Sequence, residues 1–221
     1  MKILNTLQED YHIHSINFSD GFNTIDEIVQ FAGKIGLKKI VITDHSQADL
    51  DIEGISHRCY RTTLKKRKNE YNDVDVSFGI EWDLLDEEGN CCFDIQGETA
   101  DFLILSCHRQ AYTGDKNRLT EAYINAIKKY KDRIKCLGHL CKKGIAEYLD
   151  IERIVKTANE FHIPIEFNCG YFLMGMTDLK QLHIMLSLVD ELYVNSDGHT
   201  LTDLKKRSLA FDYLKEKWFI K

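Results

Sequence analysis

The chain carries imidazole and carboxylate side chains at spacings that suit the binding of metal ions. The segment DYHIHSINFSDG places His12 and His14 two residues apart and adds Asp20 before a glycine. Successive side chains of a strand point to opposite faces, so both rings of an HxH pair lie on one face, where they can share an ion. The candidate ligands of the whole chain are His12, His14, Asp20, His45, Glu81, His108, His139, Asp197 and His199.

The elements that must position these residues alternate in type. Short β-branched runs are followed by amphipathic helical stretches, which is typical of βα units and a parallel sheet. We expect strands at 11–15, 38–45, 74–82, 101–108, 134–140, 163–169 and 191–199. We expect helices from Thr24 to Gly36 and near 56–72, 118–131, 151–162, 178–188 and 202–218, with a small hairpin at Glu88-Gly89-Asn90. Thr24 and Glu27 have the spacing of a capping box.

Seven strand–helix units favour an α/β fold that closes as a distorted seven-stranded TIM-like (β/α)7 barrel, in one domain over residues 1–221. An open, doubly wound sheet is the alternative. Six of the nine histidines fall at the ends of expected strands. The carboxyl ends of parallel strands share one mouth, so residues that are remote in sequence should converge there.

Buried together without a cation, these imidazoles and carboxylates would be costly to the fold. The mixed ligand set suits Zn, Mn or Fe. Nine candidates exceed the number of ligands that one ion takes, so two or three divalent ions bridged by a carboxylate fit better. Glu81, the acid on a middle strand, is the natural bridge. Clustered ions of this kind activate water and neutralise a phosphoryl group.

Composition narrows the class of protein. The net charge of −6 gives no global field that would attract a long nucleic acid, and no apolar run is long enough to span a membrane. The N-terminal segment does not have the pattern of a secretory signal. The seven cysteines lack paired CxxC spacing, which argues against a zinc ribbon or a disulfide framework and favours the cytoplasm. Cys107 and Cys169 flank strand ends, but a buried thiol is commonly inert, so a cysteine nucleophile has low weight.

The segments HIHS…SDG, ITDHS, GIE, SCH, GHL, EFN and SDGH, in this order, resemble the PHP family, named for polymerase and histidinol phosphatase. The resemblance covers residues 10–199 and implies a distorted seven-stranded barrel with a trinuclear centre of Mn, Zn or Fe. It assigns one ion to His12, His14, Glu81 and Asp197, a second to Glu81, His108 and His139, and a third to Asp20, His45 and His199. Some members have histidine where this chain has Asp20.

The resemblance also implies hydrolysis of a small phosphate ester by a metal-activated water. Glu81, Asp197 and His199 are the catalytic candidates, and the leaving group would take its proton from Asp197, from His199 or from a water on the metal. Arg109, Lys142 and Asn168 are candidates for holding the substrate. Histidinol phosphate, and with it a place in histidine biosynthesis, is the best named substrate. The alternatives are a nucleotide or short-oligonucleotide phosphoesterase or nuclease, and a non-catalytic metal-binding regulatory module.

Overall fold

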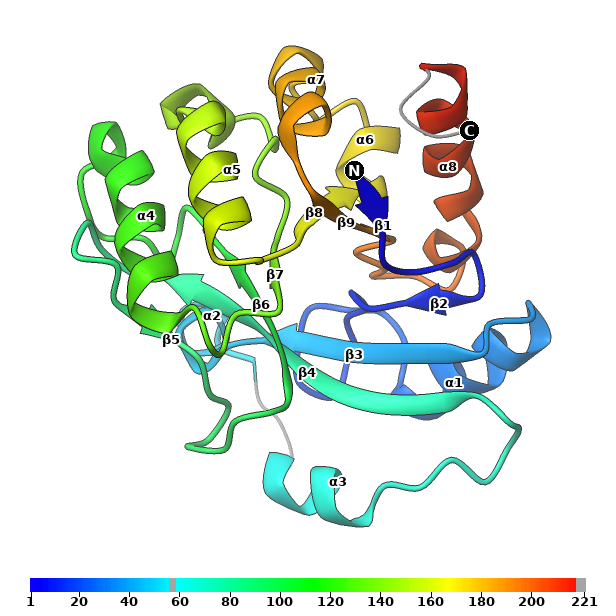
Figure 1. Cartoon of the computed structure of the whole chain (residues 1–221). Helices are drawn as coiled ribbons and strands as arrows, with labels where there is room; N and C mark the ends of the chain where they lie inside the picture. Colours follow the sequence, from blue (N-terminus) through cyan, green and yellow to red (C-terminus); the bar gives the residue numbers. More distant parts are fainter. Residues whose placement is uncertain (56–58, 218–221) are drawn as a thin grey trace.

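The computed structural model describes residues 1–55 and 59–217, and Figure 1 shows a curved sheet with helices along its outer side. The strands are β1 (Lys2–Ile3), β2 (Glu9–Asp10), β3 (Lys39–His45), β4 (Asp75–Leu84), β5 (Cys91–Cys92), β6 (Phe102–Ser106), β7 (Cys136–Leu137), β8 (Ile165–Asn168) and β9 (Glu191–Asn195). The α-helices are α1 (Ile25–Lys34), α2 (Gln47–Glu53), α3 (Tyr60–Lys66), α4 (Leu119–Tyr130), α5 (Ile151–Glu160), α6 (Cys169–Leu173), α7 (Leu179–Leu188) and α8 (Arg207–Glu216).

The sheet is parallel and runs in the order β1-β9-β8-β7-β6-β4-β3-β2. β5 lies off this path and pairs antiparallel with β4, which places the expected hairpin around Gly89. The parallel α/β architecture is thus confirmed. The count of seven strands is not confirmed, because the parallel path within the described residues has eight strands, several of them only two residues long.

The two ends of this path meet at residues 12–14. Ile13 forms a parallel bridge with Gly198, and the backbone N–H of His14 donates to the Gly198 carbonyl at 3.0 Å. On the other side, Thr43 N–H of β3 donates to the Ile13 carbonyl at 2.8 Å. The expected strand 11–15 is therefore a single bridge rather than a regular strand. The backbone of this segment forms hydrogen bonds to Gly198 on one side and to Thr43 on the other. It still presents His12 and His14 at the sheet edge.

The helix ends follow local chemistry. Glu27 N–H donates to Thr24 Oγ1 at 3.2 Å and Thr24 N–H donates to Glu27 Oε2 at 2.8 Å, so the capping box begins α1 as predicted. The helix expected at 56–72 differs. Its first residues, 56–58, lie outside the described part of the chain, and α3 ends before Arg67, whose backbone is extended. α2 was not predicted; it ends at Gly54, which has the left-handed conformation that glycine tolerates.

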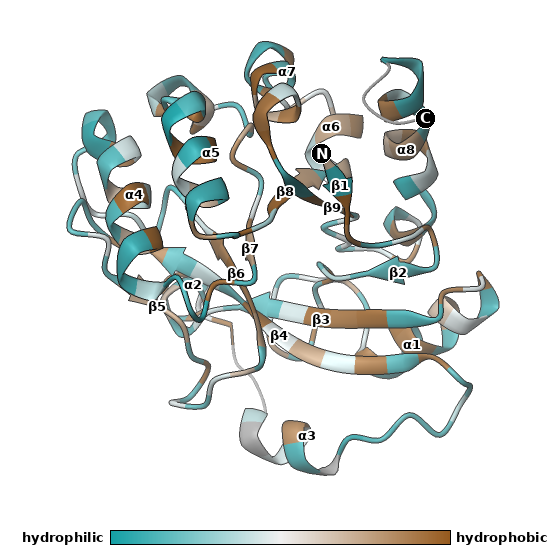
Figure 2. Cartoon of the chain, in the orientation of Figure 1, coloured by the Kyte–Doolittle hydropathy of each residue, from teal (hydrophilic) through white to brown (hydrophobic). Residues whose placement is uncertain are grey.

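The core lies between the sheet and the helices that cover it. α5, for example, buries Ile151, Ile154, Val155 and Ala158 on the face toward the sheet. Figure 2 shows the middle of β3 as hydrophobic and its ends as hydrophilic. Polar side chains therefore gather where the strands finish. Over the residues that the structure describes, no helix has the length and apolar character needed to cross a membrane.

Candidate metal centre

The nine candidate ligands come together at the carboxyl ends of the parallel strands. His45 is the last residue of β3, and Glu81 lies in the second half of β4. The others follow the ends of β2, β6, β7 and β9, and all but Asp20 and His199 are buried: His12, His14, His108, His139 and Asp197. The convergence follows from the parallel topology, because strand ends that are far apart in sequence meet at one edge.

The first group consists of His12, His14 and Glu81, with ligand atoms all within 4.8 Å of one another. Nε2 of His12 lies 3.4 Å from Oε1 of Glu81 and 3.5 Å from Oδ1 of Asp197. Nε2 of His14 lies 3.1 Å from the same Asp197 oxygen. Two imidazoles and two carboxylates thus surround one small volume.

Glu81 lies at the middle of the cluster. One of its oxygens, Oε1, is 2.8 Å from Nε2 of His139 and 3.7 Å from Nε2 of His108. The other, Oε2, is 3.1 Å from Nδ1 of His45. The side chain is 1% exposed. A carboxylate whose two oxygens face different imidazoles has the position of a bridge between two ions.

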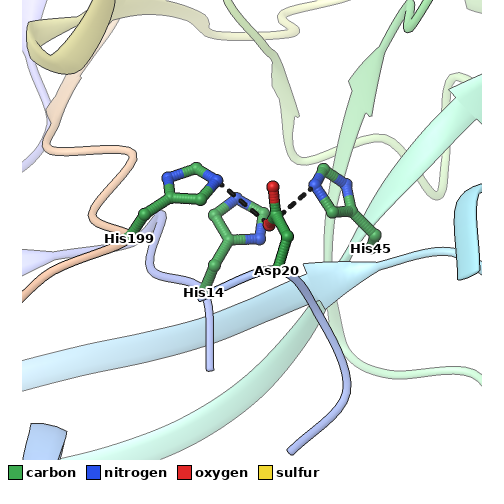
Figure 3. Close-up of side chains that lie close together, drawn as sticks. All are labelled: His14, Asp20, His45 and His199. Atoms are coloured by element: carbon green, nitrogen blue, oxygen red, sulfur yellow. Dashed lines mark ion pairs between the residues drawn. The ribbon is translucent and has the colours of Figure 1, made fainter. Parts of the chain in front are cut away.

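The third group faces the mouth and contains His14, Asp20, His45 and His199 (Figure 3). Oδ1 of Asp20 lies 3.1 Å from Nε2 of His199 and 3.4 Å from Nε2 of His45, as the dashed lines of Figure 3 mark. Asp20 is 39% exposed and His199 is 29% exposed. This side of the cluster is therefore the one that solvent reaches.

Unpartnered nitrogen atoms test whether the cluster fits a cation. Within the described residues, Nε2 of His12, Nε2 of His14 and Nδ1 of His45 are buried and have no hydrogen-bond partner. Leaving such an atom unsatisfied costs about 1–3 kcal/mol. All three face carboxylate oxygens at 3.1–3.5 Å. Imidazole nitrogen and carboxylate oxygen are the donor set of Zn²⁺ and related ions, so the residues fit a divalent metal.

The protonation states differ across the centre. Burial disfavours the charged form of His12, His45, His108 and His199, but the surrounding carboxylates outweigh it and raise the pKa of these four rings, so metal binding there would displace protons. Burial, together with His199 and His45, lowers the pKa of His14 to about 3, so this imidazole is neutral, as a metal ligand must be. Burial opposes ionisation of Glu81 and Asp197, but the surrounding histidines outweigh it and hold both pKa values well below their usual range. The centre therefore presents anionic oxygens beside a neutral ring nitrogen.

A second set of acceptors orients the rings from outside. Nδ1 of His12 lies 2.8 Å from Oε1 of Glu166, and Nδ1 of His108 lies 2.7 Å from Oδ1 of Asp83. Such contacts fix which ring nitrogen faces the metal. Sequence reasoning gave Asp83 no role, although it lies two residues after Glu81 and period 2 puts both on one face of β4. Asp83 also groups with Asp49 and His108, a set that we did not predict.

The three candidate substrate-binding residues differ in position. Asn168 Nδ2 donates to Asp197 Oδ2 and to Glu166 Oε2, both at 2.9 Å, so it lies at the centre. Lys142 donates from Nζ to Tyr171 Oη at 2.6 Å. Arg109 directly follows His108 but is exposed, and within the described residues it has neither a hydrogen bond nor an ion pair. Their roles toward substrate stay predictions.

Backbone strain marks two positions of the centre. His139 has φ 26° and Asp197 has φ 51°, values in the left-handed region that most residues avoid. Each costs about 1–3 kcal/mol and persists only where its surroundings enforce it. At Asp197 the side chain is tied to Asn168, and at His139 the backbone N–H donates to Glu166 Oε2 at 3.2 Å. The strained backbone lies where two predicted ligands must be aimed inward.

Comparison with known proteins gives consistent matches. The PHP domain family matches residues 10–166. A probable phosphatase of Caldanaerobacter subterraneus is 30% identical over 218 residues, covering 94% of this chain and 82% of the relative. A probable phosphatase of Thermoanaerobacter sp. is 29% identical over 216 residues, covering 93% and 84%.

The solved histidinol phosphate phosphatase of Lactococcus lactis, in complex with zinc, L-histidinol and phosphate, matches with a TM-score of 0.53. The match covers 96% of this chain and 94% of that one at 14% sequence identity, so it shows a shared fold.

Proposed function

The chain belongs to the PHP domain family, and from that premise we propose that it is a metal-dependent phosphatase that hydrolyses a small phosphate monoester. The observation that carries the proposal is the complete cluster at the strand ends. Nine side chains with ligating atoms converge there, and three of their buried nitrogens point at carboxylates without a hydrogen-bond partner among the described residues. A merely structural cluster would have paired those nitrogens.

We assign the ligands in three sets, two of which share Glu81. One ion would be held by His12, His14, Glu81 and Asp197, a second by Glu81, His108 and His139, and a third by Asp20, His45 and His199. Bound there, divalent ions would supply Lewis-acid activation of water and neutralise charge on the phosphoryl group. Manganese, zinc and iron are the ions to test. Occupancy of the first site would satisfy the unpartnered nitrogens of His12 and His14.

The chain's own residues would orient the metal ligands and the substrate and would protonate the leaving alcohol. Asn168 holds the Asp197 carboxylate by donating to Oδ2, which leaves Oδ1 facing His12 and His14. Asp197 and His199 line the side where a leaving alcohol would depart. Burial disfavours a charged His199, but Asp20 and Asp197 outweigh it and raise its pKa to about 9, so His199 could give the alcohol a proton, whereas the anionic Asp197 would first have to take one up. Lys142 and Asn168 lie close enough to the centre to help place the substrate, whereas Arg109 would have to swing in from its exposed position.

Histidinol phosphate is the first substrate to test. The fold is shared with an enzyme that acts on it, and the ligand set here is complete. A nucleotide or a short oligonucleotide is the second candidate, since the same centre could cleave either. A net charge of −6 disfavours a long nucleic acid. A metal-binding regulatory module is the non-catalytic alternative.

We further propose that residues 1–221 act as one domain in a reducing compartment, the cytoplasm. One continuous core cluster runs from Ile13 to Leu214, which supports the first statement. The seven cysteines are all free thiols, which supports the second.

The test is phosphate release by metal-free protein that has been reloaded with Mn²⁺, Zn²⁺ or Fe²⁺. Histidinol phosphate, a panel of other phosphomonoesters and a short oligonucleotide are assayed side by side. We expect metal-dependent turnover of at least one monoester. Turnover of histidinol phosphate alone would support a role in histidine biosynthesis, and turnover of the others alone would discard that role. Failure to release phosphate from any of them would favour the regulatory module.

A further inference from the structure

A cavity opens beside the centre, between α6 and the segment that follows β9. Its volume is about 460 Å³, and Asp197 and His199 form the end nearest the metal ligands. A volume of this size lies in the range of pockets that hold a small organic ligand. A substrate whose phosphate sits at the proposed metals would therefore find room for its alcohol part on this side.

The lining of the cavity restricts the chemistry of that alcohol. Leu173 and Met174 contribute apolar surface. Lys206 and Asp203 also line it, but Nζ of Lys206 donates to Oδ1 of Asp203 at 3.0 Å, so the two charges are already paired. The cavity thus favours a compact, partly apolar alcohol over one that carries a second phosphate.

Tyr171 contacts both this cavity and a proposed metal ligand. It lines the cavity, and its ring meets the His139 ring edge-on with centroids 5.4 Å apart. The Lys142 Nζ lies 2.6 Å from the Tyr171 hydroxyl oxygen. An ammonium group has donors but no acceptor, so Lys142 must donate and Tyr171 must accept. The phenolic O–H therefore remains available, and no acceptor for it exists among the residues described.

The position of Tyr171 is tied to the centre through one side chain. Oδ1 of Asn168 accepts from the Tyr171 backbone N–H at 2.9 Å, which caps α6, while Nδ2 donates to Asp197. The same amide therefore holds a proposed metal ligand and the residue that carries the free O–H. A donor fixed in this way loses little freedom when it meets a substrate.

We propose that this cavity receives the alcohol part of the phosphate monoester and that the Tyr171 hydroxyl donates a hydrogen bond to the ester oxygen. The inference rests on the proposed phosphatase function. In hydrolysis, a water oxygen bonds to phosphorus while the bond from phosphorus to the ester oxygen breaks. The ester oxygen keeps that electron pair and takes up one proton, which balances the proton that the attacking water gives up. The bond from Tyr171 stabilises the charge that develops on the oxygen before the proton arrives.

The test uses esters whose leaving groups differ in basicity. Metal-loaded wild type and Tyr171→Phe are compared on p-nitrophenyl phosphate, whose leaving group is weakly basic, and on 2-phenylethyl phosphate, whose alkoxide is strongly basic. We expect Tyr171→Phe to lower kcat/KM about 100-fold on the alkyl ester, the usual effect of losing one such donor. The loss on p-nitrophenyl phosphate should be less than about threefold, because that leaving group needs little stabilisation.

Tyr213→Phe is the matched control. Tyr213 of α8 packs against Phe172, the neighbour of Tyr171 in α6, with ring centroids 4.8 Å apart. Its hydroxyl contacts His183 Nε2 at 2.6 Å, and Tyr213 does not line the cavity. Tyr213→Phe should leave kcat/KM unchanged on both esters. An equal loss on both esters in Tyr171→Phe, at unchanged metal content, would assign Tyr171 a structural role and overturn the inference, as would full activity on the alkyl ester. If metal-loaded wild type hydrolysed no ester at all, the proposed function itself would fail, and this inference with it.

Discussion

Nδ1 of His12 lies 2.8 Å from Oε1 of Glu166, while Nε2 of the same ring faces Glu81 and Asp197. Both side chains are fully buried. In the neutral ring, the carboxylate accepts the Nδ1 proton and the lone pair lies on Nε2, the atom directed at the proposed metal. Glu166 thus decides the tautomer of His12 without needing to touch an ion.

Removing this acceptor should weaken metal binding. We expect Glu166→Gln to lower Zn²⁺ or Mn²⁺ affinity by about 10–100-fold, the usual effect of losing a carboxylate behind a ligating histidine. Isothermal titration calorimetry with metal-free protein measures this affinity. Glu152→Gln, on the exposed side of α5, is the control. Equal affinity in Glu166→Gln and wild type would show that Glu166 does not orient His12.

Metal should stabilise the fold through Glu81. An ion bound only by the folded state at about 100 times its Kd adds about 2.7 kcal/mol to the free energy of unfolding. Thermal melts with and without metal should show this gain in wild type and lose most of it in Glu81→Gln, which should also have no measurable phosphatase activity. Asp75→Asn, at the exposed opposite end of β4, should behave as wild type. Full hydrolysis by Glu81→Gln would refute the proposed bridge.

Arg207 should be essential for stability. Its guanidinium is 1% exposed and donates to the carbonyls of Thr6 at 3.2 Å and Leu7 at 2.7 Å, and its Nε lies 3.4 Å from Oδ2 of Asp10. We expect Arg207→Met to cost about 3–5 kcal/mol, because the Asp10 carboxylate would stay buried without a cation.

Urea denaturation measures that loss. Arg153→Met removes an exposed arginine paired with Glu121 and should change stability by less than about 1 kcal/mol. Adding Asp10→Asn to Arg207→Met should restore part of the stability. A loss as small as that of Arg153→Met would mean that the pair contributes nothing.

The rim of the cavity should set the size of the substrate. Met174 lines the cavity, whereas Met176, two residues on, does not. We expect Met174→Trp to raise KM for 2-phenylethyl phosphate about tenfold while leaving methyl phosphate unchanged, because only the larger alcohol meets the added ring. Met176→Trp should leave KM unchanged for both esters. If Met174→Trp left both KM values unchanged, the alcohol would have to lie elsewhere.

The cysteines near the centre should be dispensable. Cys107 and Cys169 are each 1% exposed, and burial raises the pKa of both thiols to about 12. A protonated, inaccessible thiol is a poor nucleophile. Cys107→Ala and Cys169→Ala should keep phosphatase activity within about threefold of wild type once refolding is confirmed by circular dichroism. Loss of activity in a folded, metal-loaded variant would reopen a cysteine mechanism.

The sequence predicted which residues converge at the strand ends better than it predicted the bounds of the elements. Strand ends such as ITDHS and SDGH carry their polar residues directly after β-branched runs, so the topology alone brings His45 and Asp197 together. The segment 11–15 could not be foreseen as a single bridge, because its hydrogen bonds depend on Thr43 and Gly198, which are remote in sequence. Asp83 could have been found from its spacing to Glu81, but its contact with His108 needed the neighbouring strand.

The bridge between Ile13 and Gly198 also sets the order of synthesis, folding and metal binding in this protein. Ser196 Oγ bonds the His12 carbonyl across 184 residues of sequence, so the first and last proposed ligands meet only after nearly all of the chain between them has left the ribosome. Until then, a nascent chain would offer the proposed centre only as separate HxH and DH fragments. Metal binding at the proposed centre would therefore come late in the protein's biogenesis, on an already assembled sheet.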